Sequence, residues 1–140
     1  MTKLDEIIQQ FQSLEPDWRL QLLLDYSEKL PPLPDEFREA RDAEIGRVEE
    51  CLTPVFLYVY LNNGRISIQA DVASEAPTVK GFVSILVHAF NGATPEDVQN
   101  MPANLLHDLG IANMIGMVRT QGLSAVIRNV KDRVLKAISA

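Results

Sequence analysis

Apolar residues recur at helical spacing through the first thirty positions, and two helices are predicted there. The apolar stripe of the first helix consists of Leu4, Ile7, Ile8, Phe11 and Leu14. Thr2 and Asp5 stand at capping-box spacing, which places the helix start at this point. Pro16 suits the first turn of a second helix, which runs towards Lys29. The three prolines of residues 30–36 end it, and we interpret this segment as a connector rather than a proline-recognition motif.

The middle of the chain has the pattern of a β-hairpin. Residues 55–61 (VFLYVYL) are almost all strand formers. Asn62-Asn63-Gly64 is a hairpin turn signal. After it, Ile66, Ile68 and Ala70 alternate with polar residues, as in a half-buried strand. Residues 47–50 are expected to add a third, short strand.

The last sixty residues are predicted to be helical. Pro77 opens a helix whose apolar stripe consists of Val79, Phe82, Val83, Leu86 and Phe90, and Gly81 within it allows another backbone to pack closely. Residues 94–97 (TPED) start a further helix, and Gly110 closes a short one. Residues 118–121, between Gly116 and Gly122, are expected to turn before a long last helix. The sum is an α+β fold, with helices packed on a small antiparallel three-stranded sheet, in one domain spanning residues 1–140.

Composition excludes several classes of protein. The net charge of −6 argues against nucleic-acid binding, which requires a basic surface. The N-terminus has no apolar signal core, and no apolar run reaches the ~20 residues that span a bilayer. A single cysteine allows no internal disulfide. We therefore expect a cytoplasmic protein without a membrane partner.

The two histidines indicate no metal site or catalytic pair. His88 falls away from the apolar stripe of its helix, so we expect a solvated side chain. His107 is interpreted as a buried, hydrogen-bonded residue, with a catalytic base as the alternative. A cysteine–histidine hydrolase would require one of them to meet Cys51 in space. Neither a metal nor a cofactor is expected.

Cys51, the only cysteine, stands between a charged stretch and the predicted strand. Free cysteines are more often inert core residues than nucleophiles. Pro54, however, favours a turning or extended backbone rather than a deep strand. A turn residue at a sheet edge can present its side chain to a partner, so both interpretations stay open on the residues alone.

Taken together, five short motifs in order resemble the SufE family of sulfur-acceptor proteins, which serve iron–sulfur cluster assembly. The motifs are R-V-x-x-C from Arg47 to Cys51, V-K-G at 79–81, N-G-x-T-P-E at 91–96, L-G at 109–110 and R-x-x-G-L from Arg119 to Leu123. The resemblance implies a SufE/IscU-like fold. It also implies that Cys51 takes sulfur as a persulfide from a cysteine desulfurase of the SufS type and stimulates that enzyme. An iron–sulfur scaffold would then receive the sulfur, and this chain would be an acceptor rather than an enzyme.

The chain departs from the family pattern near the cysteine. Glu50 stands where the family usually has glycine, and a neighbouring carboxylate disfavours the thiolate. Met114 stands where the family often has histidine. Arg119 is expected to stabilise the thiolate or hold the partner, and Asp71 and Glu75 are expected to form an acidic edge of the partner surface.

Two other functions remain as alternatives. One is a regulatory module that binds a desulfurase without accepting sulfur, its altered loop having lost the chemistry. The weaker one is the cysteine-dependent hydrolase. The sequence leaves open whether the chain forms a homodimer.

Overall fold

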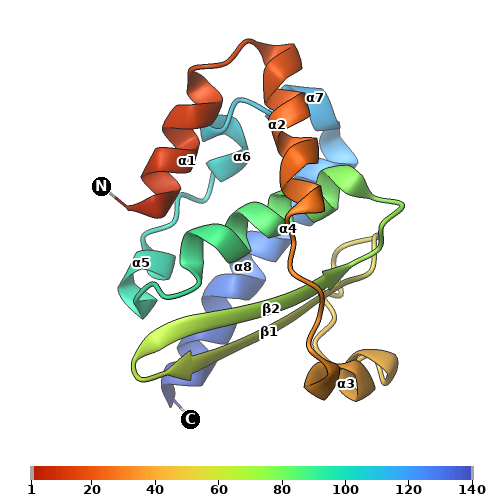
Figure 1. Ribbon diagram of the computed structural model, residues 1–140, viewed down its shortest axis with the longest axis vertical. Coiled ribbons are helices and arrows are strands. Elements are labelled where there is room, and N and C mark those ends of the chain that lie inside the picture. Colours follow the sequence, from red (N-terminus) through yellow and green to blue (C-terminus); the bar gives the residue numbers. More distant parts are fainter. Residues whose placement is uncertain (1, 140) are drawn as a thin grey trace.

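The computed structural model describes residues 2–139 and confirms the α+β class. A β-hairpin lies among helices (Figure 1). In chain order the elements are α1 (Lys3–Gln12), α2 (Pro16–Glu28), η1 (Asp35–Phe37), α3 (Arg38–Asp42), β1 (Val55–Asn62), β2 (Arg65–Val72), α4 (Pro77–Phe90), α5 (Pro95–Gln99), α6 (Leu105–Asp108), α7 (Ala112–Ile115) and α8 (Met117–Ser139). Within residues 2–139, none of these helices combines the length and apolar character that crossing a membrane requires.

The first two helices begin where the sequence predicts, although α1 ends at Gln12, before Leu14 of the predicted stripe. The Thr2 hydroxyl accepts from the Asp5 N–H at 3.1 Å, and the Asp5 carboxylate accepts from the Thr2 N–H, so the capping box is confirmed. The helix α2 starts at Pro16 and stops ahead of the prolines. Its Leu23 is fully buried, whereas Trp18 is 62% exposed.

The predicted hairpin is also confirmed. The strands β1 and β2 pair antiparallel from Val55↔Val72 to Asn62↔Arg65. Asn63 and Gly64 both have positive φ (54° and 77°), which a tight hairpin turn requires and which asparagine and glycine tolerate. Alternate side chains of β2 and the first residues of β1 are buried, so one face of the hairpin packs into the core.

The expected third strand is wrong, and the sheet that residues 2–139 form has two strands. Residues 47–50 contribute only an isolated bridge between Arg47 and Phe56. The chain turns immediately afterwards, because the Cys51 N–H donates to the Val48 carbonyl at 3.3 Å.

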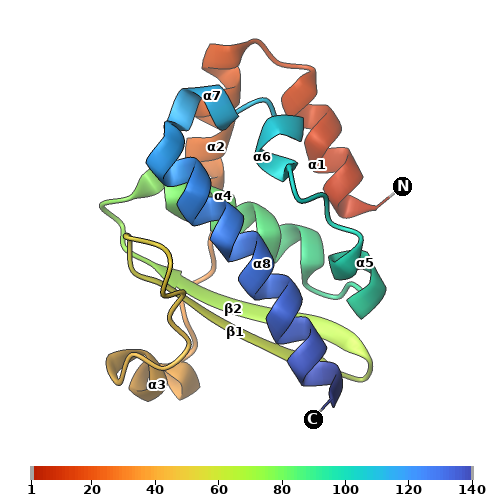
Figure 2. The same ribbon diagram turned by 180° about the vertical axis from the view of Figure 1, so that it is seen from behind.

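Two helices cover the buried face of the hairpin. The long helix α8 crosses it against β1, and α4 packs between β2 and α2, as the two opposite views show (Figures 1 and 2). Gly81 of α4 permits this packing, since a Cβ atom there would overlap the carbonyl oxygen of Leu23. On the outer face, Phe37 stacks on Tyr58 with ring centroids 4.9 Å apart.

The predicted turn over residues 118–121 is wrong, because α8 already begins at Met117. The break falls earlier, at Gly116, whose φ of 82° separates α7 from α8. The Thr94 cap of α5 and the closure of α6 near Gly110 are both as predicted.

Candidate functional site

Cys51 lies in a loop whose two ends are joined by a hydrogen bond and whose tip is exposed to solvent. Before the loop, the Val48 N–H donates to the Val55 carbonyl at 2.9 Å, closing residues 48–55 into one unit. Leu52 forms the tip and is 83% exposed. The loop lies beside the β2–α4 turn in both views, near the first turns of α4 and α8 (Figures 1 and 2).

The thiol itself is turned inward, and Cys51 is only 5% exposed. Its Sγ rests against Gly122 of α8, 3.4 Å from where a Cβ atom on that glycine would stand. A much larger residue at position 122 would fill the space that the sulfur occupies. The buried state fits the inert-core interpretation, but the thiol also borders a cavity.

That cavity has a volume of about 570 Å³ and lies beside the Cys51 loop. Its walls are Glu50, Cys51, Leu52, Thr53, Val79, Val118, Arg119, Gln121, Gly122 and Arg128. The walls combine apolar side chains with two arginines, so the space suits a group that is partly apolar and carries negative charge. Its contents would be partly sheltered from water.

Burial raises the pKa of the Cys51 thiol, because desolvation penalises the thiolate. The backbone N–H of Thr53 and the charge of Arg47 act in the opposite direction and lower it. Arg47 is itself held by Glu44, at 3.0 Å. In this resting position burial therefore favours the protonated thiol over the thiolate.

Arg119, predicted from the sequence, does line the cavity with Cys51, on the exposed side of the first turns of α8. Arg128 lines it too and was missed. Positions 118, 121, 122 and 128 share a helical face, a signal that the expected turn over 118–121 concealed. The predicted choice for Arg119, thiolate stabilisation or partner binding, stays open, since the cation acting on the thiol pKa is Arg47.

Glu50, the residue beside the cysteine, reaches towards α8. Both of its carboxylate oxygens lie near Nδ2 of Asn129, at 3.5 and 3.4 Å. The structure thus gives the carboxylate next to the thiol a partner that the sequence had not indicated.

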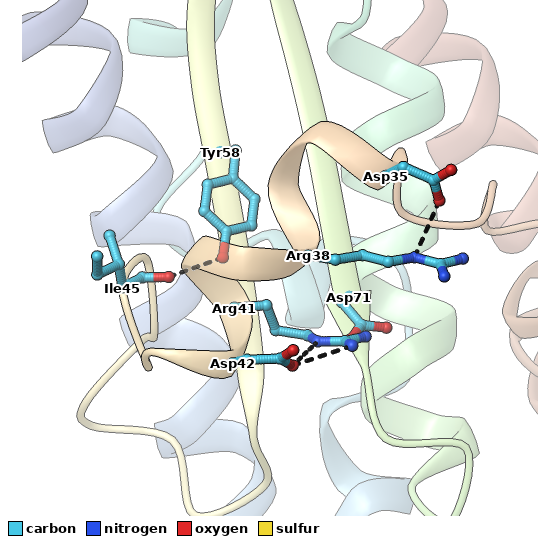
Figure 3. Close-up of polar contacts among 7 residues, drawn as sticks. All are labelled: Asp35, Arg38, Arg41, Asp42, Ile45, Tyr58 and Asp71. Carbon is cyan, nitrogen blue, oxygen red and sulfur yellow. Dashed lines mark hydrogen bonds and ion pairs between the residues drawn. The ribbon is translucent and has the colours of Figure 1, made fainter.

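The two other predicted acids are not among the residues of the cavity wall. Asp71 on β2 accepts from Arg41 of α3 at 2.9 Å, an ion pair on the outer face of the hairpin (Figure 3). Hydrogen bonding to Asp71 and Asp42 raises the pKa of Arg41. Glu75 is exposed in the turn between β2 and α4. A partner-binding role for either acid stays a prediction.

Neither histidine is among the residues that line the cavity. His107 is exposed, so the expectation of a buried side chain is wrong. It lies in the single turn of α6, where only Leu105 and Leu106 face the core. His88 is exposed as predicted, with Nδ1 2.8 Å from the Ser84 carbonyl. In the described residues, no three His, Cys, Asp or Glu side chains gather as they would around a metal ion.

Comparisons with known proteins agree on one family. The model of the SufE family, described as an Fe-S metabolism associated domain, matches residues 5–134. An uncharacterized SufE-like protein of Mycobacterium tuberculosis H37Rv is 31% identical over 96% of this chain and 92% of its own length. The sulfur acceptor protein CsdE of Escherichia coli K12 is 31% identical over 74% of this chain and 68% of its own.

A solved structure has the same fold. The solution structure of a hypothetical protein from Thermus thermophilus superposes with a TM-score of 0.84, at 32% identity, and the match covers 100% of both chains. The α+β arrangement of this chain therefore recurs over the full length of a relative.

Proposed function

The chain belongs to the SufE family, and on that premise we propose that it accepts persulfide sulfur on Cys51 from a cysteine desulfurase. The observation that supports the assignment most directly is the position of the thiol. The chain's only cysteine lies in a loop between two tied ends, against α8 and beside a cavity. Such a loop can move as a unit and return, because its ends are fixed by hydrogen bonds at Val48 and Val55.

The transfer step is a displacement at sulfur. The Cys51 thiol gives its proton to solvent, and the thiolate attacks the outer sulfur of a persulfide on the desulfurase. A bond forms between Sγ and that sulfur while the sulfur–sulfur bond of the enzyme breaks, and the electron pair leaves on the desulfurase thiolate. There is no net oxidation, and the chain has no second cysteine that could discharge the product.

The cavity supports the state after transfer. A persulfide is longer than a thiol by one sulfur and is easily oxidised or reduced when exposed. The space lined by Val79, Val118 and Gly122 can receive the added sulfur once the loop returns. Arg119 and Arg128 at its walls would favour the anionic persulfide by their charge.

Partner and place follow from the same proposal. The desulfurase would be of the SufS type, an iron–sulfur scaffold would receive the sulfur, and the cytoplasm would hold all three. Docking would stimulate the desulfurase by removing its persulfide. The residues that line the cavity include no histidine, so the surroundings of Cys51 do not favour the hydrolase alternative.

One observation keeps a second function in view. The resting thiol is buried with a raised pKa, and Glu50 replaces the glycine that the family usually has. A chain with a loop that never opens would bind a desulfurase as a regulator without accepting sulfur.

Mass spectrometry separates the two. The protein is incubated with a pyridoxal-phosphate-dependent cysteine desulfurase and cysteine, quenched with an alkylating agent, and mapped for one added sulfur on Cys51. Sulfur is expected on the native chain and none on Cys51→Ser, whose hydroxyl is similar in size but a far poorer nucleophile. Complex formation without added sulfur would favour the regulator, and full stimulation by Cys51→Ser would contradict the acceptor role.

A further inference from the structure

Arg133 of α8 holds the two ends of the Cys51 loop together. Its guanidinium donates to the carbonyls of Gly46 at 2.8 Å and Arg47 at 3.2 Å, ahead of the loop, and of Leu57 at 2.6 Å, beyond it. Burial lowers the pKa of Arg133, because the cation is drawn away from water. Burying a charged group costs free energy unless its N–H donors form hydrogen bonds. Those of Arg133 bond the carbonyls at the base of the loop.

Asn129, one turn earlier on α8, continues the hydrogen bonds of Arg133 towards Glu50, the residue before the thiol. Its Oδ1 accepts from Arg133 at 3.4 Å, and its Nδ2 donates to the Ala125 carbonyl at 2.8 Å. The same Nδ2 faces both carboxylate oxygens of Glu50 at 3.4 and 3.5 Å. The Glu50 charge in turn favours the charged form of Arg133, raising its pKa against the effect of burial.

We propose that Glu50 and Asn129 form a latch that holds the Cys51 loop closed against α8, with Arg133 as the positioning residue that fixes the base of the loop. The proposal rests on the proposed function, because a thiol that is 5% exposed must leave its resting place to meet a partner's persulfide. Glu50 adjoins Cys51 in the chain, so breaking the contact with Asn129 frees the backbone next to the sulfur.

The latch is weak by construction, which suits a contact that a docking protein must break. Glu50 is exposed, and its distances to Asn129 are long for a charge-assisted hydrogen bond. An exposed contact of this kind changes an opening equilibrium by about two- to five-fold. Arg133, by contrast, is part-buried and bonded to three carbonyls, so the base should stay fixed when the tip opens.

The test is the rate at which iodoacetamide alkylates Cys51 in the isolated full chain, measured across pH. Glu50→Gln is expected to raise the plateau rate about two- to five-fold, because the latch acts on access to the thiol. Glu49→Gln is the matched control: it removes the same charge from the neighbouring exposed residue, for which the described part of the chain shows no hydrogen bond to Asn129, and should leave the plateau unchanged.

Asn129→Ala should raise the plateau as Glu50→Gln does, and Asp132→Ala on the same helix should not. If the two residues act through each other, the double variant Glu50→Gln/Asn129→Ala opens the loop no further than either single variant. Arg133→Lys keeps the charge but cannot reach three carbonyls, so it should speed deuterium exchange at Val48 and Leu57, which Glu50→Gln leaves slow.

Equal plateaus for Glu50→Gln and Glu49→Gln, or fully additive effects of Glu50 and Asn129, would overturn the latch. These measurements involve no desulfurase. A native chain that takes no sulfur from a desulfurase, while Glu50→Gln still alkylates faster, would therefore reject the proposed function and leave the latch in place.

Discussion

At the residue scale, the reactivity of Cys51 depends on the pKa of its thiol, on which burial and two weaker effects act in opposite directions. Desolvation raises its pKa, while the Thr53 N–H and the Arg47 charge lower it. A buried, protonated thiol is poorly reactive and protected from oxidation. A sulfur acceptor needs this protection between transfers, so an unreactive resting state is compatible with the proposed role.

The first prediction is the pH dependence of Cys51 alkylation. Its midpoint should lie above the ~8.5 of an exposed cysteine, and Arg47→Gln should move it higher still, because a cation that stabilises the thiolate is lost. The measurement is the iodoacetamide rate from pH 6 to pH 10, with Arg38→Gln, an exposed arginine elsewhere, as the control. A midpoint at or below that of a free cysteine would contradict the burial argument.

The same shift has a consequence for stability. A raised pKa means that the folded state holds the thiol proton more tightly than the unfolded chain does. The stabilisation is present below the unfolded pKa of ~8.5 and is lost as pH rises through the folded value. In urea unfolding, the native chain should therefore lose more stability than Cys51→Ser between pH 8 and pH 10. An identical loss in both proteins would show that the thiol is ionised equally in the two states.

At the element scale, the accuracy of prediction follows how local each signal is. The Thr2 cap, the Asn63-Gly64 turn and the alternation of β2 are properties of a few neighbouring residues, and all were predicted correctly. The third strand was wrong because the chain turns between Val48 and Cys51, so only Arg47 bridges to Phe56 of β1. The carbonyls of Gly46 and Arg47 also accept from Arg133, far along the chain, a contact that no local pattern indicates.

The residues of the site also divide into those with a local sequence signal and those brought in by distant parts of the chain. Cys51 and Arg119 were found through motifs, and both border the cavity. Arg128 and Asn129 were missed, since each matters only through how α8 lies over the Cys51 loop. The start of α8 was placed too late because Gly122, a weak helix former, stands in its second turn.

Two glycines in helices give a matched prediction. A Cβ at Gly81 would overlap the Leu23 carbonyl, so Gly81→Ala should lower the free energy of unfolding by about 1–3 kcal/mol. At Gly122 a Cβ would meet Cys51 Sγ at 3.4 Å, an ordinary contact, so Gly122→Ala should be neutral or stabilising by up to ~1 kcal/mol. Urea unfolding of both variants checks this, and equal losses would show that close backbone packing does not explain Gly81.

The ion pair between α3 and β2 tests the predicted role of Asp71. Both side chains are about one-third exposed, at 33% for Arg41 and 35% for Asp71, so breaking the pair should cost under ~1 kcal/mol. Arg41→Gln and Asp71→Asn should thus be similarly stable. If Asp71 also contacts the desulfurase, Asp71→Asn should slow sulfur transfer more than Arg41→Gln does. Equal transfer rates would assign Asp71 a structural role alone.

At the scale of the whole molecule, exposed apolar side chains and charge meet around the cavity beside Cys51. Leu52 (83% exposed) and Val118 (64%) line the cavity together with Arg119, and Met117 (77%) adjoins Val118 in the chain. Large apolar side chains are seldom so exposed without a binding role when they cluster. The net charge of −6 would speed docking on a basic partner patch at low salt.

This surface leads to the last prediction, which concerns where the desulfurase docks. Val118→Asp places a charge among apolar side chains that a partner would bury, and should weaken binding about ten-fold or more. Leu135→Asp, at the other end of the same helix and 50% exposed, is the control that should bind normally. Titration calorimetry with the desulfurase gives both affinities. Because both positions are exposed on α8, neither change should unfold the chain, and circular dichroism checks that point. A loss of binding confined to Leu135→Asp would move the interface away from the Cys51 loop, and direct sulfur transfer to a distant thiol would then be geometrically excluded.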